Sequence, residues 1–193
     1  MATIYKCCHG QTIRPGKAWV DEHGVTHPAS WHTWSAAEKA AHGITEIVQQ
    51  EPPDSRLCTW SYNADGTVNS TPKALDDAHE VDDQGQPILD SDGKQVLTPG
   101  VKSMLIAEVK AQQGMLLAQS DWAIIRHADT GIAVPANIQQ WRNEIRLAAS
   151  VMEDQIAQAA TTDAIAALFV TYTGNPDGSI TKTGVLYDWP VLT

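Results

Sequence analysis

Apolar residues in the second half of the chain recur at steps of three or four positions. Between 101 and 119 these residues are Met104, Leu105, Ile106, Val109, Met115 and Leu116. After Pro135 they are Ile138, Trp141, Ile145 and Ala148 or Ala149. This spacing is typical of helices and predicts one helix from Val101 to about 119 and another from Pro135 to about 160.

The residues between these two helices predict a further helical segment and a defined turn. Gly131 stands where a helix ending near Ala128 needs a residue with positive φ. Pro135 stands in the first turn of the next helix, where its missing N–H would have no partner in any case. Beyond that helix, Thr162 and Asp163 are expected to cap a last short turn before an extended tail.

The first 75 residues favour short strands and turns. Asp21-Glu22-His23-Gly24 lies between short apolar segments, and Asn63-Ala64-Asp65-Gly66 predicts a hairpin turn. Ser35 and Glu38 have the spacing of a capping box at the start of a small helix, which Gly43 would close.

Residues 76–100 have a different character. An imperfect octad repeat, in which an acidic turn is followed by an apolar pair, spans 81–89 and recurs eight residues later over 89–97. It predicts either an exposed hairpin, a ladder of turns, or a solvated linker. We therefore expect an α+β fold with three parts. These are a small Trp-rich β module over 1–75, an acidic turn-rich connector over 76–100, and a helical module with an extended C-terminal tail over 101–193.

Charge and composition narrow the functions that the chain can have. Its 193 residues carry a formal net charge of −10, which argues against a phosphate-binding groove and so against nucleic acid as a partner. No run of about 18 apolar residues predicts a membrane span. The first residues lack the apolar stretch of a signal peptide, so we expect synthesis in the cytoplasm without export by a standard route.

The sequence favours a protein that is not an enzyme and that requires no cofactor or metal. His23 and His27 have helical spacing, but Gly24 and Pro28 would break a helix there. Asp90-Ser91-Asp92-Gly93 resembles the start of a calcium loop, yet Val101 occupies the twelfth position, where a glutamate is needed. Nucleophile and nucleotide-binding motifs are also missing. We expect histidines that are exposed or stacked on tryptophan rings.

Tryptophan is common in the chain, with seven residues. Trp19, Trp31, Trp34 and Trp60 fall in the N-terminal module, where we expect most of them to form the core, although Trp is also enriched at binding hot spots. The stripe containing Ile138, Trp141 and Ile145 is a candidate partner contact. It would pack on the 101–119 helix or bundle with copies of itself, and self-association through these helices is expected.

Cys7, Cys8 and Cys58 cannot all pair within one chain. Cys7 and Cys8 lie near the chain start, beside Lys6 and His9, whose charges would favour the thiolate. They are therefore candidates for an intermolecular disulfide. The alternative is an inert, reduced pair in an N-terminal strand, as is usual after synthesis in the cytoplasm.

Two blocks of the sequence resemble small tail proteins of tailed bacteriophages. One reads LLAQSDW…ADTG…VP…WR…IR within 115–146, and the other runs from Trp19 through Gly24 and Pro28 to Trp31. Trp189-Pro190 near the end is similar to the ending of fibre-assembly proteins. The resemblance implies a structural component of the virion tail at the fibre or baseplate–fibre junction, with other tail proteins as partners. The alternatives are a tail-fibre assembly chaperone and a small module that binds a host receptor or glycan.

Overall fold

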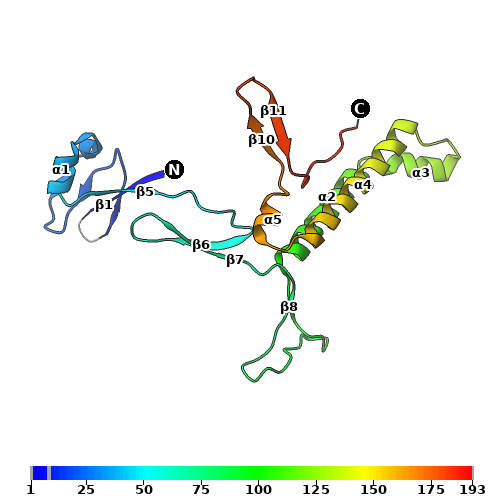
Figure 1. Ribbon diagram of the computed structural model, residues 1–193, viewed down its shortest axis with the longest axis horizontal. Coiled ribbons are helices and arrows are strands. Elements are labelled where there is room, and N and C mark those ends of the chain that lie inside the picture. Colours follow the sequence, from blue (N-terminus) through cyan, green and yellow to red (C-terminus); the bar gives the residue numbers. More distant parts are fainter. Residues whose placement is uncertain (1, 8–9, 193) are drawn as a thin grey trace. The chain divides into compact units, whose positions relative to one another are not determined.

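The computed structural model describes residues 2–7 and 10–192 (Figure 1). The chain divides into two units, Met1–Thr71 and Pro72–Thr193. The division falls close to the boundary expected at residue 75, and the 76–100 segment belongs to the second unit. Small antiparallel sheets occur beside long helices, so the predicted α+β class is confirmed.

The first unit is built from short strands around two small helices. Its strands are β1 (Ala2–Lys6), β2 (Thr12–Ile13), β3 (Trp19–Val20), β4 (Thr26–His27), β5 (Thr45–Gln49), β6 (Cys58–Tyr62) and β7 (Val68–Pro72). Its helices are η1 (Ala29–Thr33) and α1 (Ala36–Ala41). Strand β1 lies between β2 and β5 in an antiparallel sheet, while β3–β4 and β6–β7 form separate hairpins.

The capping box and the hairpin turn predicted for this part of the sequence are present in the structure. The Ser35 side chain accepts from the Glu38 backbone N–H, and the Glu38 carboxylate accepts from the Ser35 N–H, which confirms the capping box. Gly43 follows α1 with a φ of 66°. At the β6–β7 hairpin the Asn63 N–H donates to the Thr67 carbonyl, so the predicted turn is also confirmed.

The core of the first unit is a cluster of Cys7, Ile13, Trp19, Trp31 and Ile44. Trp31 is completely buried and its indole N–H donates to the Lys17 carbonyl at 2.8 Å. A sheet this small buries little area with aliphatic residues alone, so the large indole rings supply much of it. The expectation of a tryptophan core is confirmed for Trp19 and Trp31.

The acidic segment at the start of the second unit is a junction with three arms. Its stem pairs β8 (Ala78–His79) with β9 (Leu97–Thr98), and two hairpins are closed by the bridges Val81↔Pro87 and Leu89↔Gln95. These pairs favour the hairpin interpretation over a solvated linker.

A ring of backbone hydrogen bonds joins the three arms. The N–H of Ile88 donates to the Glu80 carbonyl at 3.0 Å, that of Val96 to Ile88 at 2.8 Å, and that of Glu80 to Val96 at 2.9 Å. The ring positions are eight residues apart, so the sequence octad is the structural repeat. Within each hairpin one aspartate, Asp82 or Asp90, accepts two backbone N–H groups across the turn.

The stretch before the junction caps the N-terminus of helix α2 (Val101–Ala118). The carbonyls of Ala74 and Leu75 accept from the N–H groups of Val101 and Lys102, both at 3.0 Å. The Asp77 carboxylate accepts from the Gly100 N–H at 2.8 Å. These contacts satisfy donors at a helix N-terminus that would otherwise be unpaired, because Gly100 has no capping side chain.

Two long helices, α2 (Val101–Ala118) and α4 (Ala136–Gln158), form the body of the second unit. The shorter helices are α3 (Asp121–Thr130) and α5 (Thr162–Ala166), and the final hairpin is β10 (Thr171–Gly174) with β11 (Ile180–Thr183). Figure 1 shows α2 and α4 side by side, with α3 at one end of the pair and α5 at the other. Gly131 ends α3 with a φ of 71°, which confirms its predicted role.

The end of the chain differs from the sequence expectation in two respects. Thr161, and not Thr162, caps α5, since its side chain accepts from the Ala164 N–H at 3.1 Å. A hairpin, β10–β11, closed by a turn at 175–179, lies between α5 and the extended tail. The tail is anchored because Leu186 is completely buried and its N–H donates to the Leu168 carbonyl. None of the described helices combines the length and apolar content that a membrane crossing requires.

Two glycines of the α2 region test this packing in opposite directions. A Cβ on Gly100 would lie 2.4 Å from the backbone of Leu75 and Asp76, whereas one on Gly114 would meet nothing within 4 Å. We expect Gly100→Ala to lower the free energy of unfolding by about 1–3 kcal/mol through overpacking. Gly114→Ala should raise it by about 0.5–1 kcal/mol through helix propensity. Urea unfolding of both variants measures the pair, and equal effects would contradict the close crossing at Gly100.

Candidate docking surfaces

The stripe predicted as a partner contact is buried inside the second unit. Ile138, Trp141 and Ile145 are 7%, 4% and 0% exposed. They belong to the face of α4 that packs with α2, where Leu105 and Val109 are also buried. The prediction that these three residues meet another protein is therefore wrong, and packing on the 101–119 helix was the correct alternative.

The C-terminal tail also covers this helix pair. The Trp141 indole N–H donates to the Pro190 carbonyl at 2.9 Å, and the Trp189 indole N–H donates to the Gln112 side chain at 2.7 Å. The tail is thus hydrogen-bonded to α4 through the indole N–H of Trp141 and to α2 through the indole N–H of Trp189, while both rings are otherwise apolar. Sequence periodicity could not show this contact, because Trp141 and Pro190 are 49 positions apart.

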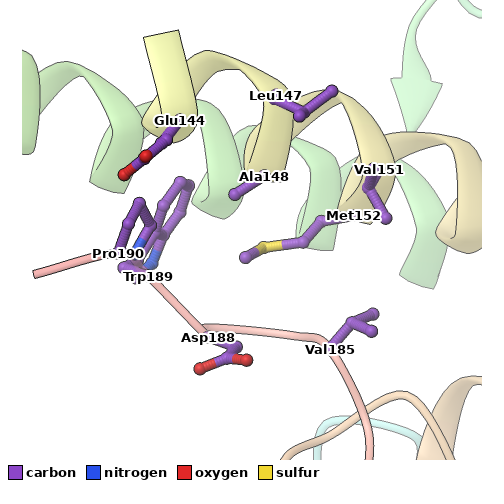
Figure 2. A pocket seen from close by; sticks show the side chains of 9 residues that line it. All are labelled: Glu144, Leu147, Ala148, Val151, Met152, Val185, Asp188, Trp189 and Pro190. Carbon is purple, nitrogen blue, oxygen red and sulfur yellow. The ribbon is translucent and has the colours of Figure 1, made fainter. Parts of the chain in front are cut away.

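A groove lies between α4 and the tail (Figure 2). It has a volume of about 440 Å³. Leu147, Ala148, Val151 and Met152 line its helical side, and Val185, Trp189 and Pro190 line the tail side. Glu144 and Asp188 add two carboxylates to its lining. The groove is therefore mostly apolar, with two acidic groups.

Exposed apolar side chains are numerous on the helices. Those more than half exposed are Met104, Met115, Trp122, Ile125 and Leu147. Helix α3 is the strongest case, because only Ala123 of its side chains is buried, while Trp122 and Ile125 are 52% and 67% exposed. Large apolar groups that gather on one element mark an interaction surface more often than isolated ones do. The sequence offered a signal in Trp122 and Ile125, which are three residues apart in a helix.

Helix α3 is held to α4 by one buried cation. Arg142 of α4 donates through Nη1 to the Leu117 carbonyl and the Ser120 hydroxyl, both at 2.7 Å, and to the Asp121 carboxylate at 2.8 Å. Its side chain is only 10% exposed. A buried arginine with these partners fixes the turn between α2 and α3, and removal of a partner would leave an uncompensated charge. Sequence analysis missed this role.

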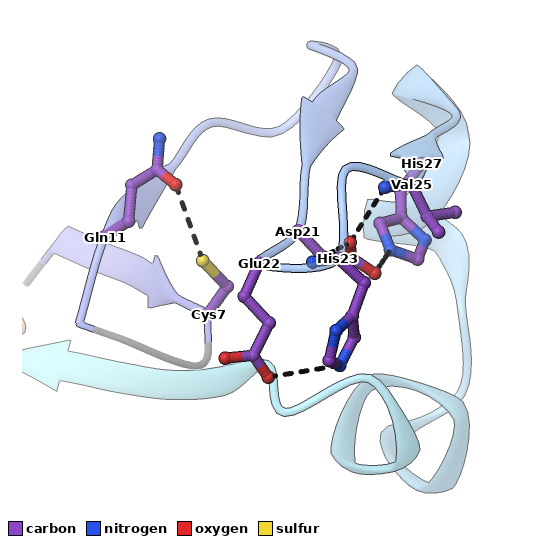
Figure 3. Close-up of polar contacts among 7 residues, drawn as sticks. All are labelled: Cys7, Gln11, Asp21, Glu22, His23, Val25 and His27. Carbon is purple, nitrogen blue, oxygen red and sulfur yellow. Dashed lines mark hydrogen bonds and ion pairs between the residues drawn. The ribbon is translucent and has the colours of Figure 1, made fainter.

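The first unit carries a compact group of aromatic and titratable side chains. The His27 ring stacks on Trp19 with 4.3 Å between centroids and lies 4.9 Å from the ring of His42. His27 Nε2 lies 3.0 Å from Asp21 Oδ2, as Figure 3 shows. The expectation of Trp-stacked histidines is confirmed for His27. Among the described residues, no three metal-binding side chains come together.

Backbone donors keep the Asp21 carboxylate charged. The Val25 N–H, followed by the His27 side chain and the His23 N–H, holds the pKa of Asp21 below its ordinary value of 3.8. The carboxylate closes the β3–β4 turn on one side and orients the His27 ring on the other. Asp21 and His27 therefore have a structural role, because Asp21 orients the His27 ring that stacks on Trp19.

The expectation of accessible thiols near the chain start is wrong for Cys7. It is 6% exposed within the core cluster, and its thiol donates to the Gln11 side chain at 3.9 Å (Figure 3). Cys7 directly follows β1 and belongs to the same buried cluster as Trp19 and Trp31, which explains its burial. Cys8 lies outside the described residues, and Cys58 is half-buried.

The comparisons with known proteins supply no relative: no protein-family model, no curated protein and no solved structure matches the chain.

The depressed pKa of Asp21 predicts an acid-sensitive contribution to stability. Such a carboxylate stabilises the fold fully above 3.8, its ordinary pKa, and the contribution is lost as pH falls through the lower pKa of the folded state. Asp21→Asn should therefore lower the thermal midpoint at neutral pH, and the gap from the native chain should narrow in acid. Melts followed by tryptophan fluorescence measure this, with the exposed Glu51→Gln as control. A gap that does not change with pH would contradict the ionic role.

The burial of Cys7 restricts the hypothesis of an intermolecular disulfide to one of the two vicinal cysteines. Any intermolecular disulfide from the vicinal pair should be formed by Cys8, because reaction of Cys7 would require opening of the core. Cys8→Ser should abolish a dimer band on non-reducing gels of oxidised protein, and Cys7→Ser should leave it. A band that survives Cys8→Ser would contradict this assignment, while no band in the native chain would indicate an inert pair.

Proposed function

We propose that the chain is a non-enzymatic structural component of a bacteriophage tail, at the fibre or baseplate–fibre junction. The phage context comes from the sequence resemblance in 115–146 and around Trp19. The observation that supports an assembly role is the exposed apolar surface of α3 and α4. Trp122 and Ile125 of α3 and Leu147 of α4 are each more than half exposed.

This surface suits recognition of a protein. Trp122 contributes a large ring at low entropic cost, and such residues dominate binding energy at interfaces. The guanidinium of Arg126 lies 5.2 Å from the Trp122 ring centroid, so the ring is held before any partner arrives. A partner that covers Trp122 and Ile125 gains their burial with little rearrangement of α3.

A second copy of the chain is the partner that we propose for the α3 surface, alongside other tail proteins at the junction. The net charge of −10 opposes contact between like surfaces. On α3, however, Trp122 and Ile125 lie beside Arg126, and Asp121 is paired with Arg142, which leaves Asp129 as the remaining acidic side chain of the helix. An apolar patch with nearly balanced charge is where two acidic chains can meet at low electrostatic cost.

Self-association should be measurable on the full-length chain. We expect it to sediment above monomer mass at tens of micromolar, roughly the range in which weak interfaces fill. Ile125→Ser should shift it toward monomer, because that change removes an exposed apolar group from the proposed contact. Val48→Ser, a similar change at a 55% exposed position in the first unit, should not. A native chain that stays monomeric throughout would refute the second-copy proposal.

Particle composition separates the tail component from its main alternative, an assembly chaperone. In purified particles of the phage that encodes it, a structural component is present at fixed copy number, whereas a chaperone is depleted after assembly. We expect quantitative mass spectrometry to find the chain in particles, and the Ile125→Ser variant to be incorporated less well than Val48→Ser. Absence of the native chain from infectious particles would contradict the proposal that it is a structural component of the tail.

A further inference from the structure

A second cavity of the helical unit has a chemical character opposite to the rest of the chain. It lies between α3, α4 and their connection and has a volume of about 420 Å³. Its polar lining is formed by His127, Gln139, Arg142, Asn143 and Arg146, and no aspartate or glutamate lines it. In a chain with 23 acidic and 13 basic side chains, two arginines and a histidine without a carboxylate form an unusual concentration of donors.

The two arginines differ in what they already bind. Arg142 forms the inner part, with Nη1 committed to Leu117, Ser120 and Asp121. Its Nε–H is buried and lacks an acceptor in the described structure. Arg146 is exposed, and its Nη1 donates to the neutral Asn143 side chain at 3.2 Å. None of the ion pairs seen among the described residues involves Arg146.

An arginine that lacks an anionic partner, set in a concave site, is suited to a carboxylate. The planar guanidinium can donate two parallel N–H groups to the two oxygens of one carboxylate. The Asn143 and Gln139 amides can add further donors from the same helix. A nucleic-acid phosphate is disfavoured, because the net charge of −10 would repel a polyanion before it reached the cavity.

The apolar part of the cavity defines the rest of the ligand. Ile124, Ala133 and Val134 line it beside the donors. A free small anion would leave these side chains uncovered, whereas an acidic residue with an aliphatic neighbour would cover them. The volume is within the range of pockets that hold such a group, about 300–1,000 Å³.

We propose that this cavity binds an Asp or Glu side chain, with an adjacent aliphatic residue, from a protein partner. Arg146 is the principal carboxylate ligand, and Ile124 and Val134 contact the aliphatic neighbour. The proposal rests on the proposed function only in taking the ligand from a neighbouring protein chain. It gives the assembly surface a specific anchor, since an acidic group is recognised here and a basic one is rejected.

Two dipeptides and one inorganic ion test the site on the full-length chain. N-acetyl-Leu-Asp-amide and N-acetyl-Leu-Asn-amide have nearly the same shape and differ in charge, and inorganic phosphate reports general anion binding. In titrations followed by NMR chemical shifts, we expect the Asp peptide to bind at least tenfold more tightly than the Asn peptide. Shifts should centre on Ile124, Val134 and Arg146. Phosphate that binds as tightly as the Asp peptide would overturn the proposal and leave an adventitious ion only.

Matched variants locate the interaction. Arg146→Gln should lower the affinity for the Asp peptide at least tenfold. Arg14→Gln, which removes the same charge from an exposed position in the first unit, should leave that affinity unchanged. Equal affinity of both variants, or equal binding of the two peptides, would overturn the proposal. Thermal melts of Arg146→Gln check that it folds, and Arg146→Lys, which keeps charge without the planar fork, should restore affinity only in part. The titration measures neither virion content nor self-association, so its failure is distinct from failure of the proposed function.

Discussion

Burial of one face of α4 is the contact on which the second unit depends. Ile145, Ala149 and Ile156 are completely buried there, and α2 supplies Val109 as a fully buried counterpart. Helix propensity alone would leave such helices marginal, so this apolar contact provides most of their stability. The contact also fixes the directions in which α3 and the C-terminal tail leave the pair. The groove beside the tail and the donor-lined cavity beside α3 both follow from where α4 lies.

Much of this arrangement could be predicted from local sequence, because local rules decide it. Gly131 ends α3 through its positive φ, Ser35 and Glu38 cap α1, and the spacing of Ile138, Trp141 and Ile145 identifies the buried face of α4. In each case residues within a few positions determine the outcome. The same periodicity could not tell whether that face meets α2 or another chain, because burial requires only an apolar partner.

The features that sequence analysis missed are the ones that join distant residues. Arg142 meets Leu117 and Asp121 across more than twenty positions, and Pro190 reaches Trp141 across 49. A lone arginine on an amphipathic helix looks like a solvated side chain until the turn that it binds is known. Cys7 was misplaced for a similar reason, since nearness to the chain start favours accessibility, while Trp19 and Trp31 bury it from a distance along the chain.

The three-arm junction at 80–98 determines where the chain can accept changes in sequence and length. Each hairpin leaves and re-enters the ring at positions eight residues apart, and its turn is closed by its own aspartate, Asp82 or Asp90. The ring does not use the residues at the turn tips. Loops of other length and composition can therefore replace either tip while Glu80, Ile88 and Val96 keep their hydrogen bonds. The junction is a place where the protein tolerates insertion, and so a natural site for diversification or for display of a foreign peptide.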